Sequence, residues 1–451
     1  MTSLGHEGTA RLVLALALLL TAAHGCGWLF VRWRQPRVVG EIVGGLLLGP
    51  SVLGALAPEL QRTVLPDDGP VASVLGGVYE LGLVLLMFAA GIELRAVIRR
   101  GERRVAGAVL AAGLALPFAA GLAITAAGDV SGLRGPADDD AALALVFAAA
   151  LAVTSIPVIA RIMLDLGLLG TSFARVVLAA AVAEDLVLYA VLAVAVGIAQ
   201  SGGEPFGLPG ELGLDAASAG GAAYYAAATT AVLAVGIAIA ALLVRESGPA
   251  RWVGVNARRS PAVQLVVVLL VTWVCLLLGV VPVFGGLVAG LVLAPALGER
   301  PAEAAAPLTG FAFTFFIPLY FALVGLRLDL GAGVDPLFVA ALILAACAIK
   351  GGSVYLGARL AGEPPGTSRH LAVAMNARGG PGIVLASVAY DAEIIDQGFF
   401  AALVILAIVT SMAAGWWLRR AAEGDPALRE PVTGRARALS RPGRRSRPEP
   451  R

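Results

Sequence analysis

The stretch "LAVTSIPVIARI", residues 151–162, interrupts an apolar segment with Thr154, Ser155 and Pro157. Proline has no backbone N–H, so inside a helix it frees carbonyl groups of the preceding turn. Within a membrane those carbonyls need hydroxyl groups, neighbouring helices or a bound cation as partners. The stretch predicts a discontinuous helix that offers oxygen ligands; a helix that is kinked without a functional role is the alternative.

A second interrupted segment lies in the other half of the chain. The stretch "MNARGGPGIVLA", residues 375–386, carries Asn376, Arg378 and four helix breakers, Gly379 to Gly382. Interrupted helices in corresponding positions of two halves are the sequence feature that best locates a transporter's ion site. The two stretches therefore predict a transport site, although a functionless kink is again the alternative.

The composition is that of an integral membrane protein. The 451 residues are 59% hydrophobic and only 14% charged, whereas a soluble domain has about 25% charged residues. The apolar residues form blocks of roughly 20, the length that a helix needs to cross a bilayer. They lack the alternation of a β-barrel strand. The predicted class is an all-α polytopic membrane protein.

Thirteen apolar blocks are candidates for transmembrane helices. Six precede a central block, Ala222 to Val244, and six follow it, and each half is interrupted in its fifth block. The central block inverts the second half relative to the first, so an inverted repeat is expected. The blocks lie near residues 10–31, 38–56, 72–93, 105–127, 141–160, 173–199, 222–244, 262–280, 282–297, 308–326, 337–358, 370–390 and 398–418.

The basic residues indicate how the chain is oriented. Of the 33 Lys and Arg residues, 27 fall on alternate connections and only four on the opposite side. Because basic residues concentrate in cytoplasmic loops, we expect a multi-pass protein of the cell membrane with its N-terminus outside and its C-terminus in the cytoplasm. The Arg- and Pro-rich tail, residues 419–451, is predicted to be disordered and to touch anionic lipid.

Two acids lie deep inside the sixth block. Glu184 and Asp185, in "AAAVAEDLVLYAVLAV" at 179–194, are about 10 residues, or roughly 15 Å, from its cytoplasmic end. Charges at that depth are costly and usually mark an ion or proton path. Neighbouring helical residues differ by about 100° in direction, so one acid can face a cavity while the other faces a packed helix. The alternative is two acids held in structural hydrogen bonds.

Lys350 is the only lysine, and it lies at nearly the same depth within "LFVAALILAACAIKGGSVYLGARL", residues 337–360. A buried ammonium needs an anion or it loses its proton, so one of the two carboxylates is the expected partner. A neutral or purely packing lysine is the alternative. Burial can tune the pKa of an ammonium but leaves a guanidinium charged, which explains a lysine in a chain that otherwise uses arginine.

Other kinds of site find no support in the sequence. The cysteines Cys26, Cys275 and Cys347 and the three histidines are scattered, so we expect no metal centre and no cofactor. We find no glycine-rich nucleotide fingerprint and expect no nucleic-acid partner. An intramembrane aspartyl protease would need two catalytic aspartates on different spans, so no enzymatic activity is expected.

At these residues the sequence resembles the monovalent cation:proton antiporter superfamily, in particular its Kef-type and sodium/proton exchanger branch. The resemblance covers roughly residues 35–418. It extends to the span that holds Lys350 and to three further stretches. These are "QPRVVGEIVGGLLLGPSVLG" at 35–54, "LGLVLLMFAAGIELR" at 81–95 and "FIPLYFALVGLRLDL" at 316–330.

The resemblance implies a fold and an assembly. It implies thirteen helices in an inverted repeat, with two discontinuous helices that cross beside the ion site, and a homodimer. Helices near 10–93 and 262–326 would form the dimerisation domain, helices near 105–199 and 337–418 a mobile core domain, and 222–244 a linker helix.

The resemblance also implies roles for individual residues. Asp185 matches the essential carboxylate, Glu184 occupies the preceding position, where relatives have Asp, Asn or Gln, and Lys350 matches the lysine that pairs with this site. "RGGPG" lacks the acid that often follows Arg-Gly in this family. The crossover residues would be Thr154, Ser155, Pro157, Asn376 and Arg378.

The expected function is secondary active antiport of Na⁺ or K⁺ against protons by alternating access. Asp185 would bind either a proton or a dehydrated cation, and broken-helix carbonyls with Thr154 or Ser155 would complete the oxygen shell. Two alternatives share the fold. One is the membrane subunit of a Kef-like regulated K⁺ efflux system, and the other is an exporter of an organic ion.

Overall fold

The computed structural model describes residues 5–33, 35–66, 68–93, 102–168, 171–199, 207–212, 219–244, 255–298, 300–331, 334–424 and 428. In these ranges the chain is helical apart from its connections and a single β-bridge between Arg134 and Ile395. The predicted tail, residues 419–451, lies almost wholly outside the described residues. Its first six residues are helical, because the last helix continues to Gly424.

The first half of the chain forms the following elements: α1 (His6–Arg32), α2 (Arg37–Leu48), the π-helical turn η1 (Pro50–Gly54), α3 (Pro58–Val64), α4 (Gly69–Glu93), α5 (Arg103–Ala127), η2 (Ser131–Leu133), α6 (Asp140–Ala152), α7 (Ile156–Asp165), α8 (Ser172–Ala199) and α9 (Leu208–Glu211). The central helix is α10 (Ala219–Val244).

The second half repeats this order: α12 (Pro261–Leu277), α13 (Pro282–Ala296), α14 (Pro301–Thr314), α15 (Phe316–Leu326), α16 (Pro336–Leu360), α17 (Pro365–Ala374), α18 (Gly379–Asp391) and α19 (Gln397–Gly424).

The helices confirm the predicted class, and a helix lies at each of the thirteen predicted blocks. Within the described ranges, ten helical segments are long and apolar enough to cross a membrane, and the shorter apolar helices α6, α12 and α13 fall on the other three predicted blocks. Both predicted interruptions are present, because α6 and α7 are separate helices and so are α17 and α18.

The tenth span differs from its prediction. It begins at Pro301 rather than near residue 308, and it is interrupted at Phe315, between α14 and α15. Pro318 cannot donate to the carbonyl of Thr314, four residues earlier. That carbonyl instead lies 2.9 Å from Nε2 of His24 on α1. Proline therefore causes this break, and a partner far away in the sequence stabilises it.

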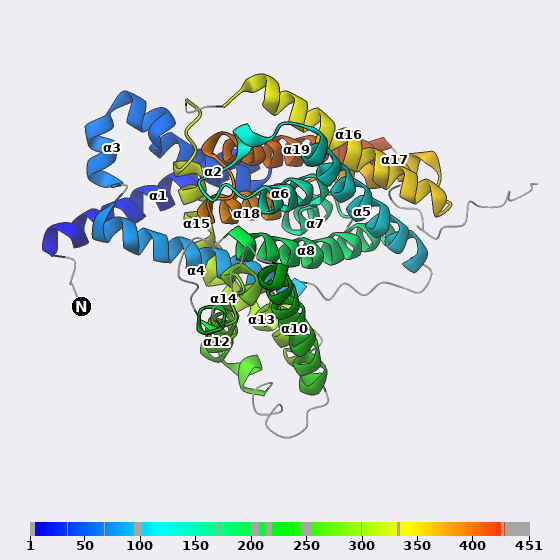
Figure 1. Ribbon diagram of the computed structural model, residues 1–451, viewed down its shortest axis with the longest axis horizontal. Helices are drawn as coiled ribbons and strands as arrows, with labels where there is room; N and C mark the ends of the chain where they lie inside the picture. The colour runs from blue at the N-terminus through cyan, green and yellow to red at the C-terminus, as the bar shows by residue number, and fades with distance from the viewer. Residues whose placement is uncertain are drawn as a thin grey trace, which may run out of the picture.

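The packing of the helices shows the inverted repeat. In the first half α1 packs against α2, and in the second α12 packs against α13; α4 packs against α13 just as α15 packs against α2. The equivalent helices α5 and α16 pack against each other. In Figure 1, α5 to α8 lie together with α16 to α19, while α10 and α12 to α14 project from the rest of the molecule.

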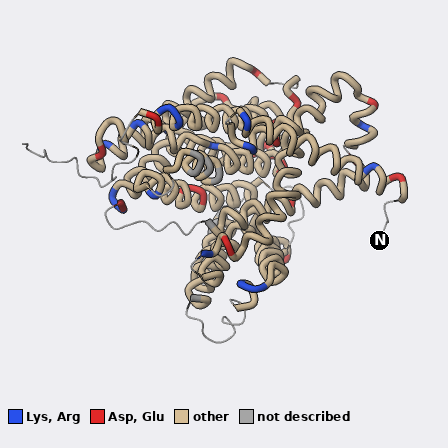
Figure 2. The backbone as a smooth tube through the Cα atoms, turned by 180° about the vertical axis from the view of Figure 1, so that it is seen from behind, with Lys and Arg blue, Asp and Glu red and all other residues tan. Residues whose placement is uncertain are grey.

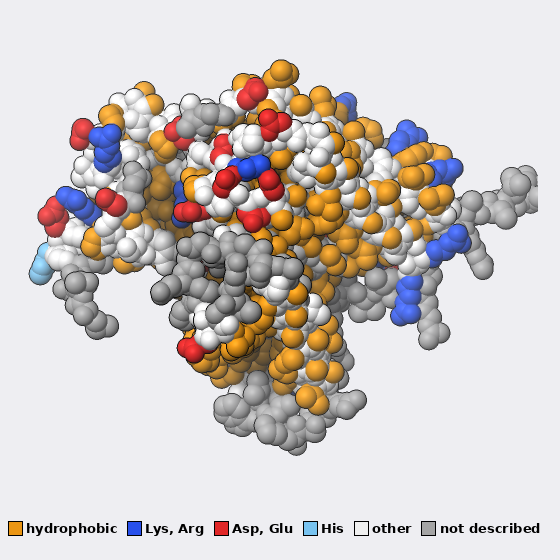
Figure 3. All heavy atoms as spheres, viewed as in Figure 1, with side chains coloured by type: hydrophobic (Ala, Val, Ile, Leu, Met, Phe, Trp, Pro, Cys, Tyr) orange, Lys and Arg blue, Asp and Glu red, His pale blue; other side chains and the backbone are white. Residues whose placement is uncertain are grey.

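Charged residues are arranged as expected for a chain that spans a bilayer. Figure 2 shows them mainly near helix ends, with long uncharged stretches between. Figure 3 shows hydrophobic side chains over α8 and α10 and acidic side chains near the connection between α5 and α6. In that connection Arg134 forms ion pairs with Asp138 and Asp140.

Candidate functional site

The two interrupted helices meet where their backbones unwind. Between α6 and α7, Thr154 donates a hydrogen bond from its hydroxyl to the carbonyl of Met375, at 2.7 Å. The backbone N–H of Ser155 donates to the carbonyl of Ala377, at 2.5 Å. Both carbonyls belong to the connection between α17 and α18, and Thr154 and Ser155 are fully buried. These bonds form the crossover of the two discontinuous helices.

Pro157 has a different local role from the one that its position within a span suggested. It is the second residue of α7. The first turn of a helix tolerates proline, because its N–H would have no intrahelical partner there. The interruption consists of residues 153–155, and Pro157 lies in the first turn of the helix that follows.

Arg378 caps the broken end of α6. Its guanidinium donates hydrogen bonds to the carbonyls of Ala150 (3.3 Å) and Leu151 (3.2 Å) near the end of α6, and to Ala346 of α16 (3.0 Å). It also donates to the side-chain oxygen of Asn376, at 3.1 Å. The last carbonyls of a helix lack partners and carry partial negative charge. A buried cation at this position satisfies both needs.

Lys350 is fully buried and donates three hydrogen bonds. Its ammonium contacts a carboxylate oxygen of Glu184 at 2.8 Å, the carbonyl of Gly113 on α5 at 2.8 Å and the carbonyl of Ala152, the last residue of α6, at 2.5 Å. An ammonium has three hydrogens, so all of them are used. The ion pair that the structure shows is with Glu184, at 0% exposure on both sides, rather than with Asp185.

Asp185 differs from Glu184 in this respect. It is 2% exposed and has no ion-pair partner in the part of the chain that the structure describes; its Oδ1, like Oε1 of Glu184, has no hydrogen-bond donor there. An unpaired carboxylate inside a bilayer is costly. The two adjacent acids therefore have different environments, as the 100° between their directions allowed.

Gly379 explains how closely the two broken helices approach. It has a φ of +33°, and a Cβ built on it would lie 2.3 Å from Val158 Cγ2 and 2.6 Å from Ser155 Oγ. Its backbone N–H donates to the hydroxyl of Ser411 on α19, at 2.9 Å. Only glycine fits between α18 and the start of α7 without displacing the crossover.

Comparison with known proteins identifies the family. Residues 15–424 match the family described as sodium/hydrogen exchanger, transmembrane. The chain belongs to the sodium/hydrogen exchanger family. It is 28% identical over 410 residues to the Na⁺/H⁺ antiporter NhaS4 of Synechocystis, covering 90% of this chain and 95% of that protein. It is 25% identical to the Na⁺/H⁺-K⁺ antiporter GerN of Bacillus cereus, covering 88% and 92%.

Two further relatives extend the comparison. The chain is 30% identical to cation/H⁺ antiporter 20 of Arabidopsis thaliana over 89% of its own length, and it spans about half, 47%, of that plant protein. The solved structure of the sodium proton antiporter MjNhaP1 from Methanocaldococcus jannaschii superimposes with a TM-score of 0.62 at 14% identity, covering 93% of this chain and 99% of that one. That likeness supports the exchanger fold.

The exchanger site includes residues that the sequence did not single out. Gly113 supplies a carbonyl to Lys350, and a Cβ at this position would lie 2.8 Å from Oε1 of Glu184. The hydroxyl of Ser411 accepts a hydrogen bond from the backbone N–H of Gly379, the first residue of α18. Gly113 lies in an Ala- and Leu-rich helix and Ser411 in another apolar helix. No feature of the sequence around either residue predicts that it contacts the site.

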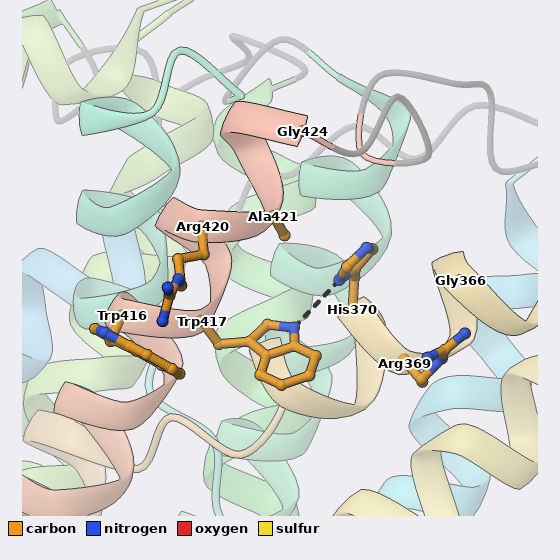
Figure 4. A pocket seen from close by; sticks show the side chains of 8 residues that line it. All are labelled: Gly366, Arg369, His370, Trp416, Trp417, Arg420, Ala421 and Gly424. Atoms are coloured by element: carbon orange, nitrogen blue, oxygen red, sulfur yellow. Dashed lines mark hydrogen bonds between the residues drawn. The ribbon is translucent and has the colours of Figure 1, made fainter.

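A surface pocket lies apart from this site, at the ends of α17 and α19 (Figure 4). Trp417 donates from its indole nitrogen to Nδ1 of His370, at 3.3 Å, and the Arg420 guanidinium lies 4.9 Å from the Trp416 ring. Tryptophan and arginine together are typical of a membrane–water interface. No residue of the crossover lines the pocket. Within the described ranges, no three His, Cys, Asp or Glu residues are grouped to hold a metal ion.

Proposed function

We propose that this exchanger-family protein is a secondary active antiporter that exchanges Na⁺ or K⁺ for protons across the cell membrane. The observation that carries the proposal is the contrast between the two adjacent acids. Lys350 neutralises Glu184, whereas Asp185 is buried and has no ion-pair partner among the described residues. A site of this kind is stable only when a proton or a metal cation occupies it.

The crossover offers oxygen ligands for the cation. Thr154 uses its hydroxyl hydrogen on the carbonyl of Met375, so the lone pairs of its oxygen remain available as ligands. Unwound carbonyls around Thr154 and Ser155 would complete the shell. Proton and cation compete for Asp185, and only a loaded, neutralised site crosses the apolar barrier at low cost. The exchange is therefore obligatory.

The packing supports the two functional units that the family resemblance implied. Helices α1, α2, α4 and α12 to α15 pack mainly with one another, and so do α5 to α8 and α16 to α19. We assign the first group to dimerisation and the second, which holds the crossover, to the mobile core. The central helix α10 contacts α8 and α13, one from each group, as a linker would.

The dimer and the orientation are further parts of the proposal. Helix α12 presents large apolar side chains outward, including Val266, Leu270 and Trp273, each more than half exposed. Such a face needs lipid or a second copy of the chain. The distribution of arginines supports an N-terminus outside and a C-terminus in the cytoplasm. We refer below to the face that holds Arg134, Arg327 and Asp391 as the outer face.

The test compares Asp185→Asn with the matched variant Glu184→Gln. Both proteins are reconstituted into liposomes, and the collapse of a preset ΔpH is followed after addition of Na⁺, K⁺ or Li⁺ separately. Asp185→Asn should abolish exchange, because an amide cannot bind a proton and a cation in turn. Glu184→Gln should be milder, because its amide oxygen still accepts from Lys350, and its pH profile should shift.

Each other outcome has a definite meaning. Robust exchange by a well-folded Asp185→Asn protein contradicts the assigned role of Asp185. Equal loss in both variants shows that the two acids act as one coupled site. Absence of exchange by the wild-type protein with any of the three cations contradicts the antiport function itself.

A further inference from the structure

Besides Oε1 of Glu184, four buried oxygen atoms near the site have no hydrogen-bond partner among the described residues. They are Oδ1 of Asp185, the hydroxyls of Tyr189 and Tyr320, and Oγ of Ser387. They come from α8, α15 and α18, and Tyr189 lies one helical turn after Asp185. Leaving a buried polar atom without a hydrogen bond is costly. Four such atoms in one region call for a common explanation.

The helices that hold these atoms pack together. Helix α8, with Asp185 and Tyr189, packs against α18, with Ser387, and α15, with Tyr320, packs against α4, with Tyr79. The rings of Tyr320 and Tyr79 lie 5.0 Å apart, and a Cβ built on Gly380 of α18 would lie 3.8 Å from Phe321 of α15. The groups are neighbours but, apart from Tyr79, make no direct hydrogen bond. Water molecules that bridge neighbouring polar groups are the usual solution in protein interiors. The row of hydroxyls therefore has the chemistry of a hydrated path.

At the outer face the row reaches an ion-pair cluster. Asp391 accepts a hydrogen bond from the hydroxyl of Tyr79, at 2.9 Å, and one from the guanidinium of Arg327, at 2.5 Å. The same guanidinium lies 4.3 Å from the centre of the Tyr79 ring. We name Tyr79, Arg327 and Asp391 the outer cluster.

The outer cluster joins the two groups of helices. Tyr79 lies on α4 and Arg327 directly follows α15, both in the group assigned to dimerisation, whereas Asp391 is the last residue of α18 in the core. Arg327 and Asp391 are 37% and 31% exposed, so their contact is at the edge of the protein rather than within it. Movement of the core relative to the other group must separate Asp391 from both partners.

We propose that Tyr189, Tyr320 and Ser387 line a hydrated path from Asp185 to the outer face, and that the outer cluster closes this path. The inference rests on the proposed function, for which such a path would carry protons and a monovalent cation. Hydroxyl oxygens suit both, because they are hard ligands and also relay protons through water. While the cluster is closed, the charge of Arg327 stands at the mouth and opposes entry of a cation.

The test measures access to Ser387 without relying on transport. Ser387→Cys is placed in a background in which Cys26, Cys275 and Cys347 are replaced by serine. A membrane-impermeant thiol reagent is then added from outside to right-side-out vesicles. Asp391→Asn weakens the outer cluster by loss of a charge-assisted bond, so it should raise the labelling rate about tenfold. Arg134→Gln is the matched control, because it breaks an outer-face ion pair within one connection, and should change the rate less than twofold.

A second measurement tests the path itself. Tyr189→Phe and Tyr320→Phe keep the ring and remove only the hydroxyl, and each should slow cation-driven ΔpH collapse several-fold. The control is Tyr355→Phe, which changes a half-buried tyrosine on α16 and should leave the rate of ΔpH collapse unchanged. Melting temperature and elution volume show that each variant is folded.

The outcomes separate this proposal from the proposed function. Labelling of Ser387→Cys only from the cytoplasmic side, or an equal rate with and without Asp391→Asn, overturns the path even when Asp185→Asn abolishes exchange. Labelling that behaves as expected in a protein whose exchange survives Asp185→Asn supports the path and contradicts the assigned role of Asp185.

Discussion

Replacing Lys350 with alanine is the sharpest test of how the core is held together. The substitution removes an ammonium that contacts Glu184, Gly113 and Ala152 with all three of its hydrogens. It leaves a carboxylate with 0% exposure without its counter-charge. It also leaves the last carbonyl of α6 without a partner. The remaining cap of that helix end would be Arg378.

The size of the effect follows from these contacts. Removing one member of a buried ion pair costs about 3–5 kcal/mol, because the other charge stays buried and unpaired. The entropy of unfolding is about 2.1 cal/mol/K per residue, or about 0.95 kcal/mol/K for 451 residues. The melting temperature should therefore decrease by roughly 3–5 °C if the chain unfolds as one unit. A larger decrease in the melting temperature would indicate that α6 is displaced as well.

The assay is thermal melting of the purified protein in detergent, with Lys350→Ala, Lys350→Met/Glu184→Gln and the wild type compared side by side. The double variant removes both charges and nearly preserves volume, so it should regain most of the lost stability. A Lys350→Ala protein that melts like the wild type and transports normally would refute the pairing. A double variant as unstable as Lys350→Ala would show that the carbonyl contacts, not the charge, carry the effect.

Two further predictions concern topology and the crossover. A cysteine at exposed Ser131 should react with an impermeant reagent from outside and one at exposed Arg259 only from the cytoplasm; labelling of both from one face would overturn the thirteen-span topology. Gly379→Ala places a Cβ 2.3 Å from Val158 and should cost about 1–3 kcal/mol of stability and much of the exchange rate. Gly352→Ala, with nothing within 4 Å of its Cβ, should have little effect on either quantity.

The spans and their interruptions could be predicted because they depend on local chemistry. A block of about 20 apolar residues favours a transmembrane helix whatever surrounds it. The prolines and glycines around Pro157 and Gly379 determine which backbone conformations are possible, whatever the surrounding structure. The residues at the two interruptions were therefore identifiable, and the structure brings Thr154, Ser155, Asn376 and Arg378 together at the crossover.

What the sequence left open depends on how the helices pack. The choice of Glu184 rather than Asp185 as partner of Lys350 is set by the rotation of α8 relative to α16 and α5. The break at Phe315 needed Pro318, which was visible, and His24, which lies 290 residues from the carbonyl it contacts. No local sequence pattern predicts a contact between residues so far apart in the chain.

The hydrogen bonds of Lys350 also bear on the charge moved in each cycle. Glu184 and two carbonyls engage all three ammonium hydrogens, and these contacts favour the charged form of Lys350. If Lys350 keeps its proton throughout the cycle, the proposed site exchanges one proton for one cation at Asp185. No net charge should cross the membrane.

The consequence can be measured in proteoliposomes with an imposed membrane potential. A transported elementary charge would change the driving force by about 2.3 kcal/mol per 100 mV, whereas one-for-one exchange should leave the extent of ΔpH collapse unchanged. The matched variant is Glu184→Gln, which removes the counter-charge of Lys350 and so allows the ammonium to release its proton. Dependence on potential in the wild type would mean that Lys350 or Glu184 exchanges a proton in every cycle, and that their ion pair opens whenever Asp185 is loaded.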